Sequence, residues 1–209
     1  MDFKDKIQLG NTGLKVGRLG ISSNYGAPAD AYEEAYERGC NYFTWGSFMK
    51  GRSREMRKAM RNMIARGERD KLVISFLNYS HSQFLTERSV RRGLRHLGTD
   101  YGDVLLLGWY RKGFKQWIDG ALKLKERGII RAIGITSHNR SLFPELAKEG
   151  IFDIFHVRYN AANSGAEQDV FPFLDTENRP GIIAFTATRW GQLLKQNKMP
   201  LNSKVNLAW

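Results

Sequence analysis

The stretch that decides the fold runs from Tyr101 to Arg140 and reads YGDVLLLGWYRKGFKQWIDGALKLKERGIIRAIGITSHNR. Its apolar run at 104–107 is too short for a helix and is bounded by glycines, which is typical of a strand buried on both faces. A helical period follows over 115–126, and a second apolar run spans 129–135. A strand, a helix and a strand at this spacing predict a βαβ unit with two parallel strands.

The same alternation of short apolar runs and amphipathic stretches continues along the whole chain. Strands are expected at 19–21, 41–45, 72–77, 104–107, 129–135, 154–157 and 181–185, and helices at 29–38, 52–66, 86–96, 115–126 and 142–148. Strands that alternate with helices imply a parallel sheet. Residues 7–16 alternate apolar and polar about an Asn-Thr-Gly turn, which predicts a β-hairpin before the first of these strands.

These elements favour an α/β fold that is nearly a complete barrel. A TIM-type (β/α)8 barrel typically takes about 250 residues, with about 200 near the lower limit. The chain has 209 residues, and 205–209 is the only candidate for an eighth strand. We therefore predict a single domain over 1–209, with an N-terminal hairpin in 1–18, a barrel incomplete after about strand seven and an irregular tail over 195–209. An open sheet edge would favour a homo-oligomer.

Composition places the chain among globular proteins. Hydrophobic residues make up 42% of it and aromatic residues 12%, far from the composition of disordered chains. No apolar run approaches the roughly 18 residues of a membrane span, so no membrane insertion is expected. The single cysteine, Cys40, excludes an internal disulfide and suits a reducing cytoplasm, where we expect the protein to be located.

The chain is strongly basic, with 33 Lys and Arg against 21 Asp and Glu and a formal net charge of +12. Such a charge can attract nucleic acid, anionic lipid or a phosphorylated small molecule. The cations concentrate in two amphipathic helical patterns, at 51–71 and 87–98. The simplest interpretation is a solvated surface, because no recognition motif or interleaved aromatic residue accompanies them, and specific nucleic-acid binding is not expected. Four scattered histidines and one cysteine predict no metal site.

Polar and aromatic residues crowd just past the carboxyl ends of the expected strands, where α/β folds place their ligand sites. The residues expected to line this mouth are Trp45, Trp109, Arg111, Asn139, Arg140, Arg158, Asn160 and Trp190. Arginine suits carboxylate or phosphate and indole suits a flat ring, so an anionic small molecule is the expected partner. Alternatively, some of these arginines form structural salt bridges with Glu167, Asp169 or Asp103.

Several segments carry a family resemblance. TDYGDVLLL followed by LKERGIIRAIGITS, together with LGNTGLKVGRLGI, AYERGCNYF, VRYN and GIIAFTATRWGQLL, resembles the aldo-keto reductases in the same order along the chain. The resemblance implies a barrel of aldo-keto reductase type, a hairpin that plugs its amino-terminal end, and oxidoreductase activity with NADP. Members of the family continue well beyond strand seven.

The family's catalytic Asp, Tyr, Lys and His are absent at the matching positions. These positions are Thr44 for the aspartate, Phe48 or Met49 for the tyrosine, Leu77 or Asn78 for the lysine, and Gly108 for the histidine. In the family, the tyrosine donates a proton to the carbonyl oxygen and the other three groups tune or orient the reaction. Any carbonyl reduction here therefore needs a different proton donor. Tyr25, Tyr79, Tyr110 and Tyr159 and also His138 follow expected strands, and His138 and Tyr110 are the candidates for catalysis.

The resemblance also implies where NADP would bind. Thr136 and Ser137 match the Ser-Asn pair that holds the nicotinamide carboxamide, and His156 lies nearest the family's glutamine. The loop that embraces the pyrophosphate matches Thr186, Thr188 and Arg189. The family's adenine contacts follow strand eight, for which the sequence offers no clear counterpart.

Three functions are consistent with the sequence. The first is an NADP-dependent oxidoreductase of the aldo-keto reductase type with an atypical proton donor. The second is a redox-inactive barrel that binds an anionic small molecule at its mouth. The third is a basic interaction protein that contacts nucleic acid or a membrane surface through its cationic helices.

Overall fold

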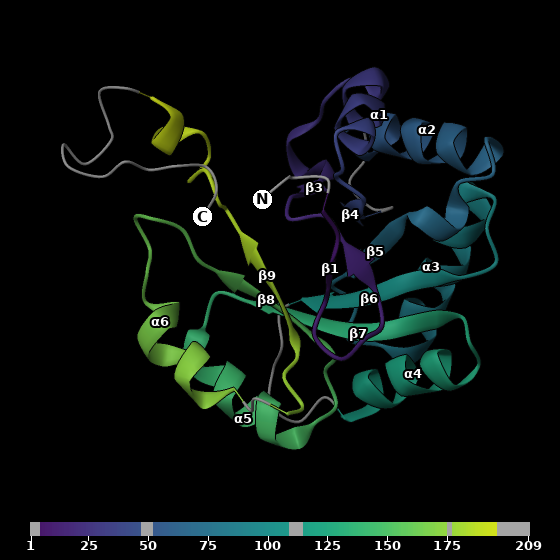
Figure 1. Ribbon diagram of the computed structural model, residues 1–209. Helices are drawn as coiled ribbons and strands as arrows, with labels where there is room; N and C mark the ends of the chain where they lie inside the picture. Colours follow the sequence, from purple (N-terminus) through teal and green to yellow (C-terminus); the bar gives the residue numbers. More distant parts are fainter. Residues whose placement is uncertain (1–4, 47–51, 109–114, 175–176, 196–209) are drawn as a thin grey trace.

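The computed structural model describes residues 5–46, 52–108, 115–174 and 177–195 and contains a curled parallel sheet (Figure 1). Seven strands form this sheet and pair with their neighbours in sequence order. They are β3 Gly20–Ser22, β4 Tyr42–Trp45, β5 Val73–Asn78, β6 Gly102–Gly108, β7 Ile130–Ser137, β8 Ile154–Arg158 and β9 Gly181–Phe185. Within the described residues, this arrangement confirms the predicted α/β barrel, with seven strands and no closure by an eighth. The candidate eighth strand at 205–209 and most of the predicted tail lie outside the described residues.

Helices surround the outer side of the sheet (Figure 1). They are α1 Ala29–Glu37, α2 Arg52–Ala65, α3 Gln83–Leu97, α4 Lys115–Glu126, α5 Phe143–Glu149 and α6 Ala166–Asp169. Short 3-10 turns are η1 Ser23–Tyr25, η2 Arg69–Lys71, η3 Arg140–Leu142, η4 Phe171–Phe173 and η5 Gln192–Leu194. None of the described helices is long and apolar enough to cross a membrane.

Local sequence signals set the ends of α3. The Ser82 side chain accepts a hydrogen bond from the backbone N–H of Leu85, which satisfies one of the free donors of the first turn. The helix therefore starts three residues earlier than the expected Thr86. Gly98 ends it in the left-handed conformation at φ 75°, which glycine adopts without steric cost.

Alternation along the strands divides the core into two layers. The larger layer lies between the helices and the sheet and includes Trp45, Phe76, Trp117 and Phe155. The smaller layer lies inside the curl of the sheet, where strand side chains pack against apolar residues of the hairpin formed by β1 (Ile7–Gln8) and β2 (Lys15–Val16). It consists of Leu9, Leu14, Val16, Tyr42, Val73, Val104, Ala132 and Ile154. The hairpin therefore plugs the amino-terminal end, as the family resemblance implied.

Asp103 holds this amino-terminal end together from the outer face of β6. Its carboxylate is fully buried, and it contacts Arg69 Nη2 at 3.0 Å and Arg131 Nη1 at 3.1 Å. It also accepts a hydrogen bond of 2.9 Å from the backbone N–H of Ile74 on β5. The arginine partners that the sequence suggested for Asp103 were those at the mouth, but strand order places Asp103 at the opposite end.

We expect Asp103→Ala to lower the free energy of unfolding by about 3 kcal/mol, because it leaves the largely buried Arg69 without its anion. Urea denaturation followed by circular dichroism measures this loss. Glu126→Ala is the matched control, since Glu126 is exposed on α4. Equal stability of the Asp103→Ala variant and wild type would show that the ion pairs do not hold this end.

Candidate functional site at the carboxyl ends of the strands

Strand register brings four polar or aromatic side chains to the inner face of the sheet near its carboxyl edge. Thr136 on β7 lies opposite His156 on β8, and Arg158 lies opposite Phe185 on β9. The two-residue period places them on the same face as the inner-layer residue Ile154. The carboxyl ends of β7, β8 and β9 thus form one wall of the candidate site.

Arg158 is held by an aromatic ring rather than by a carboxylate. Its guanidinium carbon lies 5.5 Å from the centroid of the Trp190 ring, which is a cation–π contact. Its Nε is buried and has no hydrogen-bond partner among the described residues. Trp190 is itself 54% exposed. Arg158 therefore keeps both charge and hydrogen-bonding capacity for a ligand at the mouth.

The loop after β9 has an unusual backbone that the side chain of Asn160, two residues after β8, helps to fix. Thr186, Arg189 and Trp190 adopt φ angles of 57°, 49° and 53°, a region that costs non-glycine residues about 1 kcal/mol or more each. Asn160 Nδ2 donates a hydrogen bond of 2.9 Å to the Thr186 carbonyl, and the Arg189 N–H donates to the same oxygen at 2.7 Å. Strain of this kind clusters at ligand-binding sites.

The two threonine hydroxyl groups of this loop differ in whether they form hydrogen bonds within the described residues. Thr186 Oγ1 is buried and has no partner among the described residues, whereas Thr188 Oγ1 accepts a hydrogen bond of 3.2 Å from the Gly191 N–H. Arg189 is exposed. A buried hydroxyl without a partner is costly unless a ligand or water satisfies it.

The segment after β7 is organised by its own side chains. Ser137 Oγ accepts a hydrogen bond from the Asn139 N–H at 3.0 Å, and Asn139 Oδ1 accepts from the Ser141 hydroxyl at 2.8 Å. The His138 ring is exposed and lies edge-on to Phe185, with 5.2 Å between ring centroids. His138 thus lies at the rim of the mouth, next to Phe185, which is the last inward-facing residue of β9.

The Tyr79 ring lies against Gly108, the position that the resemblance matches to the family's histidine. A Cβ atom built on Gly108 would lie 2.1 Å from Cε1 of the Tyr79 ring, so no side chain at 108 fits beside it. Burial raises the pKa of the Tyr79 phenol. From the sequence, Tyr79 was only one of four tyrosines that follow expected strands. A glycine at the histidine position was the one signal that another side chain could enter this space.

The structure corrects the prediction that Trp45 lines the mouth. Trp45 alternates with the inward-facing Thr44, so its ring lies in the outer layer and is 1% exposed. There its Nε1 donates a hydrogen bond of 3.0 Å to the Ser53 carbonyl, and the ring contacts Phe76 edge-on at 5.8 Å.

Two further mouth residues are engaged by the protein itself. Asn160 is only 3% exposed and uses both ends of its amide, since Oδ1 accepts from the Ala162 N–H at 3.0 Å. It therefore supports the Thr186 loop. Arg140 Nε lies 2.8 Å from Asp169 Oδ2, which confirms the alternative interpretation as a salt bridge for this arginine.

Glu167 binds Tyr159 rather than one of the mouth arginines among the described residues. It accepts a hydrogen bond from the Tyr159 hydroxyl, and burial together with this carboxylate raises the pKa of Tyr159 to about 12. The positions that lie outside the described residues are Phe48, Met49, Trp109, Tyr110 and Arg111. The described residues also contain no group of three or more His, Cys, Asp or Glu that could hold a metal ion.

Below the mouth, a buried pair joins opposite parts of the sheet. The Tyr42 hydroxyl on β4 lies 2.9 Å from Nε2 of His156 on β8. Burial lowers the pKa of His156 to about 3 and raises that of Tyr42, so both groups are neutral near pH 7. The hydrogen bond to Tyr42 therefore fixes the orientation of the His156 ring within the interior.

We expect His156 to make the stability of the protein fall with decreasing pH. Unfolded His156 takes up a proton near pH 6.5, whereas the folded form stays neutral down to about 3. The free energy of unfolding should therefore decrease through this window by up to about 1.4 kcal/mol per pH unit. Chemical denaturation at several pH values measures the slope.

His156→Gln is the informative variant, because glutamine can keep a hydrogen bond to Tyr42 but does not titrate. Its stability should depend less on pH than that of wild type. His138→Gln, at an exposed ring, should leave the slope unchanged. The same slope in wild type and His156→Gln would contradict the assignment of a buried neutral imidazole.

Comparison with known proteins agrees with the geometry. The model of the aldo/keto reductase family matches residues 6–206. The structure resembles that of a protein assigned as an aldo-keto reductase from Pseudomonas aeruginosa, with a TM-score of 0.71 and 24% identity, covering 88% of this chain and 79% of that one. It also resembles an aldo-keto reductase from Bacillus halodurans in its holo form, with a TM-score of 0.77 and 22% identity, covering 96% of this chain and 70% of that one. No curated protein matches. The family model extends over nearly the whole chain, which therefore belongs to the aldo/keto reductase family.

Proposed function

We propose that the chain is an NADP-dependent oxidoreductase acting on carbonyl compounds, with a proton donor different from that of its family. Family membership supports an oxidoreductase-like function. The observation that carries the cofactor proposal is the pair of buried polar atoms without partners, Thr186 Oγ1 and Arg158 Nε, at the ends of two adjacent strands. Buried polar atoms are nearly always satisfied, so a ligand with acceptor groups suits this place.

The residues present fit a nicotinamide dinucleotide. Thr136 and Ser137 offer hydroxyl groups for an amide, and both are half-buried. The Thr186 hydroxyl and the Arg158 and Arg189 guanidiniums offer donors for phosphate oxygens. When bound, such a cofactor supplies a hydride to the carbonyl carbon. The protein's own part is then to hold the substrate and to deliver a proton to its oxygen.

Tyr79 is the described residue that suits proton donation. Its phenol occupies the space above Gly108, where the family has the histidine that orients the substrate. A phenol with a raised pKa stays protonated at pH 7 and can donate a hydrogen bond to a carbonyl oxygen. His138 on the rim is the second candidate, and Tyr110 remains a sequence prediction.

Two replacements favour a second candidate function. Thr44 matches the family's aspartate, and Leu77 or Asn78 matches its lysine; the three are 9%, 6% and 3% exposed. None carries a charge, so none stabilises the phenolate that forms when a tyrosine donates its proton. The alternative is a barrel without redox activity that binds an anionic aromatic molecule between Arg158 and Trp190, where both a cation and a flat ring are available.

NADPH titration separates these functions. We expect NADPH to bind with a change in its nicotinamide fluorescence, and Arg158→Gln to weaken binding at least about tenfold, because a charge-assisted hydrogen bond is lost. Lys148→Gln on α5 removes the same charge at an exposed position and should bind like wild type. No change at about 1 mM NADPH would exclude the first function. Arg158-dependent binding of benzoate in that case would support the second.

We expect Tyr79→Phe to lower kcat for reduction of an aromatic aldehyde by about 100-fold, because the general acid is lost. The affinity for NADPH should remain, since the phenol is assigned to the substrate oxygen. Tyr159→Phe is the matched control, because that hydroxyl donates to Glu167. A kcat unchanged in Tyr79→Phe but reduced in His138→Gln would transfer the role to His138.

A further inference from the structure

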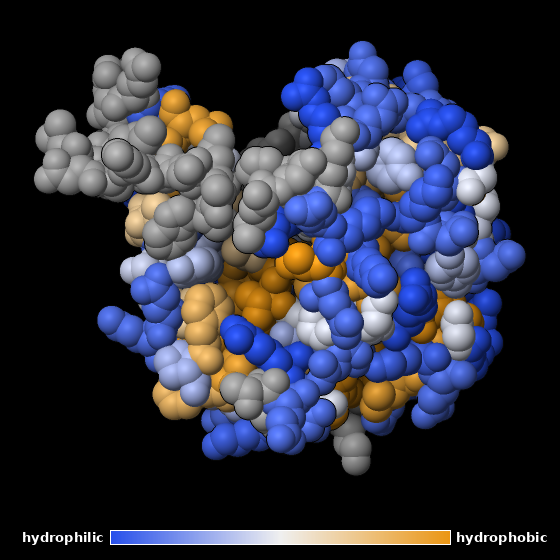
Figure 2. Space-filling view, viewed as in Figure 1, coloured by the Kyte–Doolittle hydropathy of each residue, from blue (hydrophilic) through white to orange (hydrophobic). Residues whose placement is uncertain are grey.

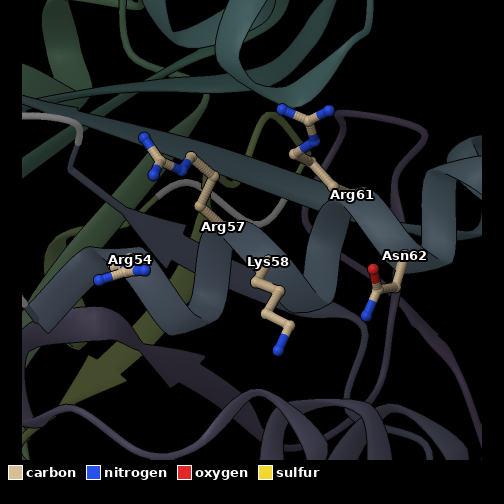
Figure 3. A pocket seen from close by; sticks show the side chains of 5 residues that line it. All are labelled: Arg54, Arg57, Lys58, Arg61 and Asn62. Atoms are coloured by element: carbon tan, nitrogen blue, oxygen red, sulfur yellow. The ribbon is translucent and has the colours of Figure 1, made fainter.

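Helix α2 carries a row of cations along its exposed side. Arg54, Arg57, Lys58 and Arg61 follow the i, i+3, i+4, i+7 spacing of one helical face, while Met56, Ala59, Met60 and Met63 are buried on the other. With Asn62, the four cations line a shallow hollow of about 260 Å³ (Figure 3). The surface around α1 and α2 is mostly hydrophilic (Figure 2).

One side of this row is neutralised by α1. Asn62 Nδ2 donates a hydrogen bond of 2.7 Å to Glu33 Oε1, and Arg66 forms an ion pair with the same carboxylate at 2.6 Å. The pKa of Glu33 is lowered chiefly by the Arg66 hydrogen bond and in part by the charge of Lys58. Lys58 and Asn62 point away from Arg57 and Arg61 in the close view (Figure 3).

The other side of the row meets α3 without an acidic counterpart. Arg92 and Arg95 of α3 are exposed, and Arg61 Nη1 lies 3.5 Å from the His96 carbonyl. Partial burial lowers the pKa of His96, and the charges of Arg57, Arg92, Arg95 and Arg61 lower it further. The charges of all four arginines therefore act on one imidazole. We call Arg57, Arg61, Arg92 and Arg95 the α2–α3 arginine surface.

None of these four arginines forms an ion pair with a carboxylate in the described part of the chain. Neighbouring arginines do, since Arg91 and Arg127 both contact Glu87, at 2.8 Å and 3.0 Å. Like charges that gather without counterions raise the local potential and favour a bound anion. The four come from two helices in contact, so the cations are spread over two helices rather than along a single one.

We propose that the α2–α3 arginine surface binds the phosphodiester backbone of a nucleic acid. Arginine's planar fork matches phosphate oxygens, and several separated cations suit an anion whose charges repeat along a chain. None of the large apolar side chains exposed in the described residues lies on α2, so no base-stacking platform is present there. Binding is therefore independent of sequence, and it uses the outer helices rather than the barrel mouth.

An anionic membrane is the competing partner, and the position of the apolar residues argues against it. Phe84 and Leu85 are 68% and 52% exposed, but they lie in the first turn of α3. At 1.5 Å per residue, Leu85 is about 10 Å from Arg92 along the helix axis. Membrane-surface helices place apolar side chains along the helix beside the cations, whereas here the centre of the arginine surface has none.

Fluorescence anisotropy tests the proposal with two labelled probes of about 20 nucleotides, a single-stranded oligouridylate RNA and a duplex DNA, between about 50 and 300 mM salt. Wild type should bind at least one probe with an affinity that falls steeply with salt. Arg57→Gln/Arg61→Gln and Arg92→Gln/Arg95→Gln should each weaken binding at least about tenfold at the lowest salt and reduce the salt slope.

Lys123→Gln/Lys148→Gln removes the same charge from exposed sites on α4 and α5 and should bind nearly as wild type does. Circular dichroism of each variant verifies that the fold is retained. Equal weakening by the control pair would overturn the proposal, because net charge alone would then explain binding. The proposal would also be overturned if wild type bound neither probe. Arginine-dependent binding to phosphatidylserine vesicles, with no binding to the two probes, would overturn it in favour of a membrane surface. The relative affinity for RNA and DNA identifies the polymer.

Discussion

Parallel pairing of consecutive strands is the constraint on which the rest of this structure depends. Each strand from β3 to β9 contacts the next one along the chain, so all carboxyl ends meet at one edge. The two-residue period then sends every second side chain inside the curl and the others toward the helices. Ile154, His156 and Arg158 occupy successive inner positions of β8, and these three residues span the molecule from its apolar plug to its mouth.

This layering separates neutral from charged polar groups. The bond between Tyr42 and His156 lies deep in the interior, where burial keeps both side chains uncharged. Among the described residues, Asp103 with its arginines lies at the amino end and Arg158 beside Trp190 lies at the carboxyl end. The two ends differ in their hydrogen bonding, because Asp103 is paired within the protein whereas Arg158 Nε is buried without a partner among the described residues.

The same distinction applies to the outer surface. The strong positive charge of the chain is not uniform, because some arginines have acidic partners whereas Arg57, Arg61, Arg92 and Arg95 have none in the described part of the chain. The carboxylate of Glu33 on α1 offsets the positive charge on one side of α2. On the other side of α2, α3 adds further cations. A basic composition thus becomes a localised field only when two helices are packed side by side.

The sequence by itself determined the strand order, the hairpin and most helix ends to within one residue, because these follow from local patterns. Matched segments likewise placed Thr44, Leu77 or Asn78, and Gly108 where the family has its catalytic aspartate, lysine and histidine. Only the tertiary structure decided that Trp45 faces the helices, that Arg140 pairs with Asp169, and that the Tyr79 ring covers Gly108. The direction of a side chain at a strand end depends on the curl of the sheet and on neighbours distant in sequence. Alternation in the sequence shows only that Thr44 and Trp45 face opposite sides of the sheet. Contacts between distant residues decide which of the two sides is the interior, and these contacts leave no periodic signal in the chain.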